Sequence, residues 1–298
     1  MTFFSSIDEA RSALAGTGYL VDDELATVVF LGDALGKPIL LEGPAGTGKT
    51  ELAKAVAEAA GAELVRLQCY EGLDEARALY EWNYRKQLLR IQAVQAAAAA
   101  GQEAGAESWS ELHDDIFGEE FLLSRPLLTA IRKTTPTVLL IDETDKADVE
   151  VEGLLLEVLS DFQVTIPELG TVSATRRPFV VLTSNATREL SEALKRRCLY
   201  AHVDYPEPAR ERAIVMSRVP EISEELALSI VRAIKALRAL DLRKAPSVAE
   251  TIDWANALLA LGVEELTDDV VGQTLGVVLK HQSDRVKARE QLRVGGAS

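Results

Sequence analysis

The sequence predicts an α/β protein in which a parallel sheet is flanked by helices and is followed by a small all-helical domain. Short apolar runs recur through the first 205 residues with helical segments between them, a pattern typical of parallel strands buried on both faces. A glycine-rich loop joins the first apolar run to a helix. Beyond Pro206-Glu207-Pro208 only helical periodicity remains.

Five segments have the apolar character of strands. We expect strands at residues 37–42, 63–68, 137–141, 178–182 and 199–203, the last being the weakest. A helix rich in Ala, Leu, Lys and Glu runs from Thr50 to about Ala60, and Gly61 ends it. Strands alternating with helices in this way indicate a parallel sheet.

The chain between the second and third strands, about residues 70–133, is longer than a strand–helix–strand unit needs. We interpret it as an insertion. Its aromatic part (Tyr80, Trp82 and Tyr84) predicts a helix, the alanine run 96–100 predicts a solvated helix, and residues 101–118 predict an acidic loop.

The remaining chain predicts a helical domain over residues 206–298, after a first domain over residues 1–205. Helical spacing relates Leu226, Ile230, Ile234 and Leu237. Ser247-Val248-Ala249-Glu250 has the form of a capping box that opens a further helix. A last helix is expected from about Asp268 towards Arg289.

Composition argues against several classes of function. The 298 residues carry 32 Lys and Arg against 47 Asp and Glu, and the net charge of −15 argues against a nucleic-acid footprint or an anionic membrane surface. No apolar run reaches membrane length, and the first residues do not resemble a signal peptide. Cys69 and Cys198 are far apart, which favours a reducing compartment, so we expect a cytoplasmic protein.

A loop between the first strand and its helix fits the phosphate-binding pattern G-x-x-x-x-G-K-T. Its glycines let backbone N–H groups surround phosphate oxygens, and the helix N-terminus adds partial positive charge. Lys49 can reach the β- and γ-phosphates, and the Thr50 hydroxyl can ligate Mg²⁺. The alternative is a glycine turn that only starts a helix. We expect ATP with magnesium to contact Gly43, Pro44, Ala45, Gly46, Thr47, Gly48, Lys49, Thr50 and Glu51.

Polar residues follow the next two buried strands. Asp142 is placed to hold the magnesium ion and its water, and Glu143 to polarise the attacking water. Asn185, after the fourth strand, is placed to contact the γ-phosphate or that water, although its segment also reads as an ordinary turn. We interpret Asp145 and Asp148 as solvated loop carboxylates.

Two arginines close a short helix that begins near Leu190. One interpretation is that Arg196 and Arg197 complement the dipole at the helix C-terminus. The other is that Arg197, with Arg196 as a substitute, reaches the γ-phosphate bound by a neighbouring subunit, where it would stabilise charge in the transition state.

Together these residues resemble the AAA+ ATPases. Gly43–Thr50 is similar to Walker A, Val138–Glu143 to Walker B, Asn185 to sensor 1 and Arg197 to the arginine finger. Within that superfamily the chain resembles the MoxR group, in particular the branch associated with carbon monoxide dehydrogenase and related molybdenum hydroxylases. The stretch Phe162–Pro206 and Leu79-Tyr80-Glu81-Trp82 carry this resemblance, which covers nearly the whole chain.

The resemblance implies a sheet of order 5-1-4-3-2, a helical lid and a hairpin at residues 163–175. It also implies a hexameric ring with ATP at subunit interfaces, a von Willebrand factor A-domain partner, and a metalloenzyme client that is matured or receives its metal cofactor. Three alternatives stay open: a metal-chelatase-type motor subunit, a nucleotide-gated binding module and a nucleic-acid remodeller.

Two features of the nucleotide site are less defined by the family pattern. Many MoxR relatives carry a sensor 2 arginine in the lid, whereas this chain has Ala245-Pro246-Ser247 there, with Arg243 just upstream. By resemblance, the segment before the first strand packs on adenine, and here that segment is Tyr19, Leu20 and Val21.

Overall fold

The computed structural model describes residues 2–99 and 109–295. Over these residues the main sheet has five parallel strands in the order β2-β5-β8-β1-β9. They are β1 (Ile39–Glu42), β2 (Glu63–Gln68), β5 (Thr137–Asp142), β8 (Phe179–Ser184) and β9 (Leu199–His202). Counted along the chain, this is the order 5-1-4-3-2, so the predicted α/β fold is confirmed.

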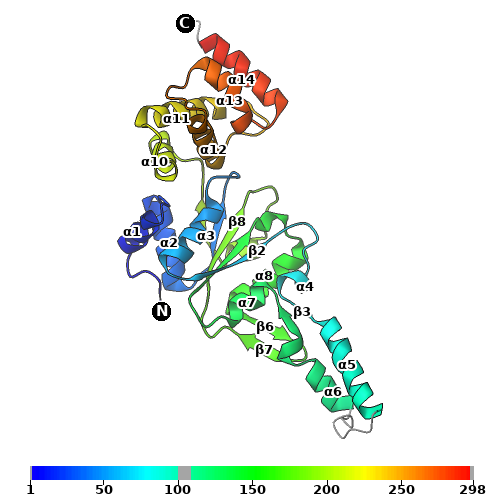
Figure 1. The fold of residues 1–298 in the computed structure, drawn as a ribbon. Coiled ribbons are helices and arrows are strands. Elements are labelled where there is room, and N and C mark those ends of the chain that lie inside the picture. The colour runs from blue at the N-terminus through cyan, green and yellow to red at the C-terminus, as the bar shows by residue number, and fades with distance from the viewer. Residues whose placement is uncertain (1, 100–108, 296–298) are drawn as a thin grey trace.

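Helices cover both faces of the sheet because its strands are apolar on both sides. Ile39 and Leu41 pack on one face, whereas Leu40 between them packs on the other. The first face is covered by α1 (Ile7–Gly16), α2 (Asp23–Leu35) and α3 (Lys49–Ala59), and the second by α7 (Pro126–Arg132) and α8 (Val149–Asp161) (Figure 1). The carboxyl ends of all five strands therefore meet at one edge, where ligands bind in open α/β sheets.

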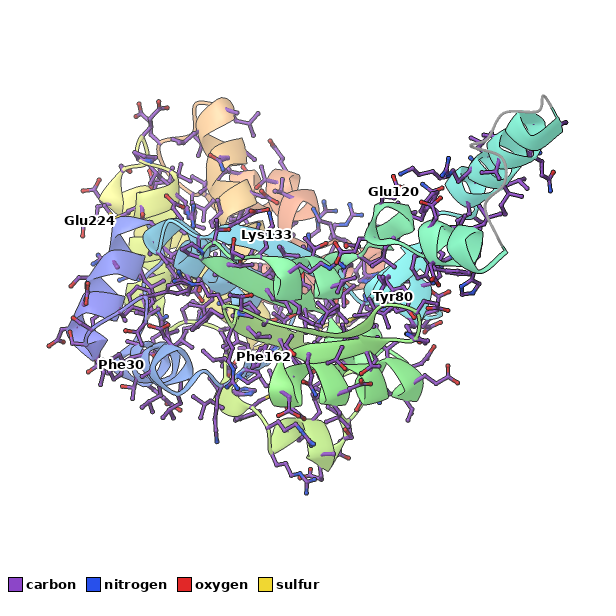
Figure 2. All side chains as sticks on the ribbon, turned by 90° about the horizontal axis from the view of Figure 1, so that it is seen from below. Phe30, Tyr80, Glu120, Lys133, Phe162 and Glu224 are labelled. Atoms are coloured by element: carbon purple, nitrogen blue, oxygen red, sulfur yellow. The ribbon has the colours of Figure 1, made fainter. Side chains whose placement is uncertain are left out.

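The insertion contains α4 (Glu75–Ala78), β3 (Tyr80–Trp82), α5 (Tyr84–Ala99), α6 (Trp109–Ile116), a 3₁₀ turn (Glu119–Phe121) and β4 (Leu122–Ser124). Of these, α5 and α6 form an arm that extends away from the sheet (Figure 1 and Figure 2). The expectation of an aromatic helix is wrong for its first part. Tyr80 and Trp82 pair antiparallel with Ser124 and Leu122, and the buried Trp82 side chain joins the core.

The expectation of an acidic loop over residues 101–118 is wrong for residues 109–116, which are helical. Leu112 and Ile116 pack against Val94 of α5, and this apolar contact stabilises the helix. Residues 101–108 of that predicted loop, and Ala100 of the alanine run, lie outside the described residues. Ala96 and Ala99 lie exposed on α5 as expected.

Two short elements complete the part before residue 206. An antiparallel hairpin of β6 (Gln163–Ile166) and β7 (Gly170–Ser173) follows α8, at the position expected for a hairpin. The helix α9 (Glu192–Lys195) leads to β9 and carries the two arginines at its end.

Five helices with a separate apolar core follow β9 (Figure 1). They are α10 (Pro208–Arg218), α11 (Glu224–Arg238), α12 (Val248–Ala260), α13 (Asp268–Val278) and α14 (Gln282–Gly295). The capping box of Ser247 and Glu250 is present. The single last helix expected from Asp268 is wrong, because Leu279 adopts an extended conformation and is buried in the core between α13 and α14. Over the described residues, every helix is too short or too polar to cross a bilayer.

Candidate nucleotide site

The phosphate loop connects β1 to α3 and has a shape that depends on glycine. Gly43, Gly46 and Gly48 adopt φ angles of +154°, +75° and +94°, which side chains disfavour. A Cβ atom on Gly43 would lie 2.1 Å from the carbonyl oxygen of Val203, so a larger residue does not fit. Gly48 caps α3 without a side-chain hydrogen bond, which leaves the first amides of the helix free for an anion.

Lys49 is buried inside this loop. Its Nζ donates to the carbonyl oxygens of Gly43 at 2.7 Å and Pro44 at 2.6 Å. Burial lowers the pKa of the Lys49 amine, although the carboxylates of Asp145 and Asp142 oppose that shift. The long, flexible side chain can exchange the two carbonyl oxygens for phosphate oxygens.

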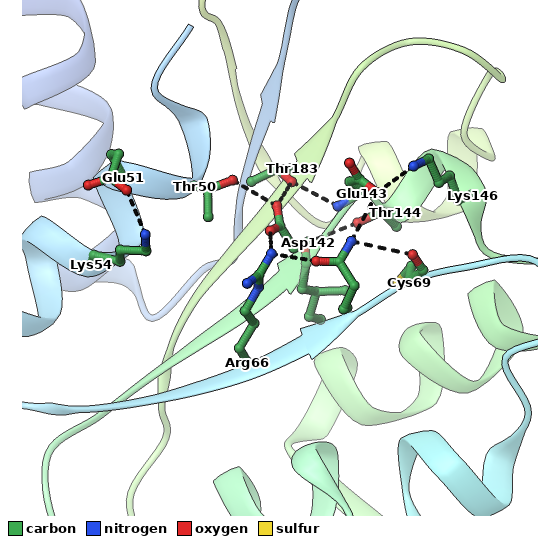
Figure 3. Close-up of polar contacts among 12 residues, drawn as sticks. Thr50, Glu51, Lys54, Arg66, Cys69, Asp142, Glu143, Thr144, Lys146 and Thr183 are labelled. Carbon is green, nitrogen blue, oxygen red and sulfur yellow. Dashed lines mark hydrogen bonds and ion pairs between the residues drawn. The ribbon is translucent and has the colours of Figure 1, made fainter. Parts of the chain in front are cut away.

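Asp142, the last residue of β5, is the centre of a polar cluster (Figure 3). Its Oδ1 accepts hydrogen bonds from the hydroxyls of Thr50 at 3.0 Å and Thr183 at 2.5 Å. Its Oδ2 accepts from the guanidinium of Arg66 at 2.5 Å. The fold thus brings together the loop threonine and the strand carboxylate that the sequence analysis assigned to one magnesium ion.

These two side chains fit that ion. Mg²⁺ prefers one or two hard oxygen ligands from protein, together with water and phosphate oxygens. Thr50 and Asp142 offer a hydroxyl and a carboxylate oxygen 3.0 Å apart. No group of three or more His, Cys, Asp or Glu side chains forms a metal cage within the part of the chain that the structure describes. The pair therefore suits an ion that arrives with a nucleotide.

Glu143 follows Asp142 in a left-handed backbone conformation, with φ 56° and ψ 48°. Its amide donates to the hydroxyl of Thr183 at 2.9 Å. Its carboxylate accepts from the side-chain amide of Gln68 at 3.0 Å and from Nζ of Lys146 at 2.6 Å. The carboxylate is therefore held from two sides, by β2 and by the turn after β5.

Asp145 is buried, so the interpretation of it as a solvated loop carboxylate is wrong. Its carboxylate accepts from the amides of Asn185 and Thr187, both at 3.1 Å, and from the Thr187 hydroxyl at 2.5 Å. Burial alone would raise the pKa of Asp145, but these hydrogen bonds outweigh it and lower the pKa. Asp145 thereby fixes the position of Asn185 beside β5. Asp148 is exposed, as expected.

A cavity of about 340 Å³ unites these groups. Its walls include the phosphate loop, Asp142, Glu143, Asn185 and Glu51. Tyr19 and Leu20 also line it, whereas Val21 packs in the apolar core behind it. The Tyr19 hydroxyl donates to the Gly48 carbonyl oxygen at 3.2 Å, and burial raises its pKa. The predicted base-contacting segment is thus adjacent to the phosphate loop.

The helices after β9 close the cavity with residues that the sequence analysis did not select. Arg210 and Arg218 of α10 line it. Arg210 donates to the Asp22 carboxylate at 2.7 Å and to the Leu20 carbonyl oxygen at 2.6 Å. Arg243 is not among the lining residues. Arginines on an amphipathic helix usually face solvent, so the sequence pattern did not indicate that Arg210 and Arg218 line the cavity.

The two candidate finger residues differ in their surroundings. Arg197 donates to the hydroxyl of Ser160, at the end of α8, at 2.7 Å and to the carbonyl oxygen of Ala193 at 3.0 Å. Arg196 is exposed, and its side chain makes no hydrogen bond or ion pair with the described residues. At its other end α8 contributes Glu152, which accepts from the Ser191 amide at 3.0 Å and pairs with Arg188. Both ends of α8 therefore contact the segment that carries the arginines.

The parallel sheet, the phosphate loop and the carboxylates beside it define a P-loop ATPase. A family model described as "AAA domain (dynein-related subfamily)" matches residues 38–198. The chain belongs to this AAA family.

Similarity to individual proteins varies in extent. The chain is 32% identical to chaperone protein ClpB 2 of Parasynechococcus marenigrum (strain WH8102) over 146 residues, which are 49% of this chain and 13% of that protein. It is 24% identical to protein NorQ of Paracoccus denitrificans (strain Pd 1222) over 281 residues, which are 88% of this chain and 92% of NorQ. The chain thus spans a small part of ClpB 2 and nearly all of NorQ.

Solved structures of Thermotoga maritima RuvB are also similar. The RuvB Holliday junction branch migration motor aligns with a TM-score of 0.45 and 18% identity, over 85% of this chain and 67% of that chain. A variant of the same protein aligns with a TM-score of 0.48 and 16% identity, over 92% of this chain and 71% of that chain.

Proposed function

We propose that this ATPase uses magnesium-bound ATP to remodel a partner protein, as a member of the MoxR group. The contact between Thr50 and Asp142 carries the catalytic part of this proposal, because it joins the loop hydroxyl to the carboxylate of the strand end. Glu143 is the next residue, beside the same cavity. A magnesium ion bound there would neutralise charge on the β- and γ-phosphates.

The side chains around that position have separate tasks in the proposal. Lys49 binds the β- and γ-phosphates after leaving the carbonyl oxygens of the loop. Glu143 leaves Gln68 and Lys146 and polarises the attacking water. Asn185, held by Asp145, orients that water or the γ-phosphate. Tyr19 and Leu20 contact the base.

The site is completed by a second copy in this proposal. Arg197, or the exposed Arg196, reaches the γ-phosphate bound by the neighbouring subunit of a hexameric ring. Rings of AAA ATPases commonly have six subunits, and a cation supplied in trans stabilises the transition state. Residues 206–298 act as a lid over the nucleotide, and residues 1–205 as the catalytic domain. Arg210 and Arg218 support this division because they reach the cavity from α10.

We further propose that the ring works in the cytoplasm with a von Willebrand factor A-domain protein. Its client would be a metalloenzyme, a molybdenum hydroxylase such as carbon monoxide dehydrogenase, which it matures or activates. The similarity to NorQ over 88% of the chain supports the view that the two proteins share the same domain organisation. The name of the ClpB 2 relative, a chaperone, supports a remodelling role. The arm of α5 and α6 offers a surface for a partner.

The catalytic proposal is tested with Glu143→Gln. We expect this variant to bind ATP but to release phosphate about 10²–10⁴-fold more slowly, because the water is no longer polarised. Glu150→Gln, an exposed residue on α8, is the matched control and should turn over normally. Normal turnover in Glu143→Gln would refute the role of Glu143.

The remodelling proposal needs a different measurement. ATP hydrolysis is measured with and without a co-expressed A-domain protein, and activity of the client enzyme is measured after incubation with ATP. We expect stimulation of hydrolysis and an ATP-dependent gain of client activity. ATP-dependent binding without stimulation would instead favour a nucleotide-gated binding module.

A further inference from the structure

Arg66 is a cation at the nucleotide site that neither the motifs nor the proposed catalytic steps use. It lies on β2, an edge strand of the sheet, and its side chain is 49% exposed. Residues two apart on a strand share a face, so Arg66 and Gln68 point to the same side. Gln68 lies directly opposite Asp142 in the strand register. Arg66 therefore approaches Asp142 diagonally, from the neighbouring strand (Figure 3).

One nitrogen of the Arg66 guanidinium donates to two groups. It contacts Oδ2 of Asp142 and Oε1 of Gln68, each at 2.5 Å. The opposite end of the Gln68 amide donates to Glu143 at 3.0 Å. Arg66 thus contacts one of the two carboxylates directly and the other through Gln68.

The two oxygens of Asp142 have different partners. Oδ1 faces the hydroxyls of Thr50 and Thr183, whereas Oδ2 faces Arg66. Asp142 is 4% exposed, so its charge has little compensation from water, and Arg66 is its one ion-pair partner within residues 2–99 and 109–295. A buried carboxylate is stabilised by such a pair, whereas a second cation at the same carboxylate repels the first.

We propose that Arg66 is a positioning residue that neutralises Asp142 until a magnesium ion displaces it. This inference rests on the proposed magnesium site. The half-exposed Arg66 side chain can turn into water when it leaves Asp142, at little cost in solvation. Its departure also removes the partner of Oε1 of Gln68, whose amide holds Glu143. Metal binding is in this way coupled to loosening of the contact that restrains Glu143.

Removal of Arg66 should change nucleotide binding in two opposite directions. Without magnesium, the uncompensated charge of Asp142 repels the triphosphate, so affinity should fall. With magnesium, the ion no longer competes with a guanidinium, so less of it should be needed. Ion pairs with one exposed partner are worth little, so each effect should be about 2- to 5-fold.

The experiment uses Arg66→Met in the full chain and a fluorescent, non-hydrolysable ATP analogue. Affinity is measured in EDTA, and the magnesium concentration for half-maximal binding is then titrated. We expect about 2- to 5-fold weaker binding in EDTA and a 2- to 5-fold lower half-saturating magnesium concentration. A general loss of structure would weaken binding under both conditions, so the opposite signs identify the proposed competition.

Three further variants complete the test. Lys133→Met removes the ion pair with Glu63 at the other end of β2 and should change neither value. Arg66→Lys keeps the charge and should stay near wild type. Gln68→Leu leaves Asp142 and Arg66 in place and should keep the wild-type magnesium requirement. An unchanged or higher requirement in Arg66→Met, or the same shift in Lys133→Met, would overturn the inference.

The wild-type protein separates this inference from the proposed function. If it binds no nucleotide with or without magnesium, the proposed site itself fails. If it binds nucleotide in a magnesium-dependent way and Arg66→Met has the same dependence, only the role of Arg66 fails.

Discussion

The backbone amide of Val248, in the first turn of α12, donates to the carbonyl oxygen of Gly46 in the phosphate loop at 3.2 Å. Ser247 lies against the same glycine, since a Cβ atom on Gly46 would be 2.3 Å from its Cβ. The helical segment thus touches the loop through main-chain atoms, directly after Ala245-Pro246. A shift of the loop on nucleotide binding would be transmitted to α12 through this contact.

Gly46→Ala should separate α12 from the loop. The added methyl group would overlap Ser247, and overpacking of this kind costs about 1–3 kcal/mol of stability. Nucleotide affinity should fall about tenfold, because the loop amides shift with the backbone. Thermal unfolding and binding of an ATP analogue measure the two effects. Gly61→Ala is the control, since Gly61 also has a positive φ of +57° but nothing within 4 Å of its Cβ.

Asp145→Asn should reduce hydrolysis while nucleotide still binds. The amide nitrogen would face donors that now bond to a carboxylate, so Asn185 and Thr187 would lose acceptors. A buried polar group without its partner costs about 1–3 kcal/mol. Urea unfolding and phosphate release are the measurements, with the exposed Asp148→Asn as control. Wild-type turnover in Asp145→Asn would show that the position of Asn185 does not depend on this carboxylate.

Acid should destabilise the contact between α8 and the arginine-bearing segment. Burial would raise the pKa of Glu152, but hydrogen bonds from Ser191 and the Arg188 ion pair outweigh it and lower the pKa. A lowered folded-state pKa gives stability that is present above the ordinary value of 4.5 and lost as pH falls through the folded value. The free energy of unfolding of the wild type should therefore exceed that of Glu152→Gln at neutral pH, and this difference should disappear below about pH 4.5.

Urea unfolding at several pH values measures that difference. Glu150→Gln, on the same helix but exposed, should follow the wild-type curve. A difference between wild type and Glu152→Gln that is constant from neutral to acid pH would contradict the assignment of the ionised form to the folded state.

Mixing two inactive variants tests the site between subunits. Lys49→Ala and Arg197→Ala should each lose about 10³-fold or more in rate. In a mixed ring, about a quarter of the interfaces would pair an intact Lys49 with an intact Arg197. Activity should recover in the mixture only if the two residues act across an interface.

Arg196 decides between the two candidate fingers. Because Arg197 already contacts Ser160 and Ala193, it must leave them to reach a neighbour, whereas Arg196 is unrestrained. The mixing experiment is repeated with Arg196→Ala. Loss of activity in Arg196→Ala but not in Arg197→Ala would move the role to Arg196.

The fold was predictable where a local pattern was strong. Apolar runs, and for β2 an alternation of apolar and polar residues, located the strands to within two residues. Thr50 and Asp142 were expected together because the phosphate loop and the carboxyl ends of parallel strands share one edge of the sheet. The pairing of Tyr80 and Trp82 with β4 was missed because its partners lie about forty residues away, across the arm.

The site residues that the sequence did not reveal are defined by partners from other strands, which a local sequence pattern does not include. Asp145 resembles Asp148 in sequence, and only the end of β8 distinguishes them by supplying two amides to Asp145. Arg66 and Gln68 are two residues apart on β2 and therefore share a face, but their partners Asp142 and Glu143 belong to the end of the adjacent strand and the turn after it. Cross-strand partners of this kind follow from topology and register.

The position of α8 has a mechanical consequence. The helix begins just after the turn that holds Lys146 and Asp145, and Ser160 in its last turn contacts Arg197. A helix packed in the protein core moves as a rigid body, because the close-packed core resists compression. A small tilt at its start would swing the arginine end in proportion to its length. In the ring proposed above, a change at one catalytic centre would therefore move the arginine that faces the neighbouring centre.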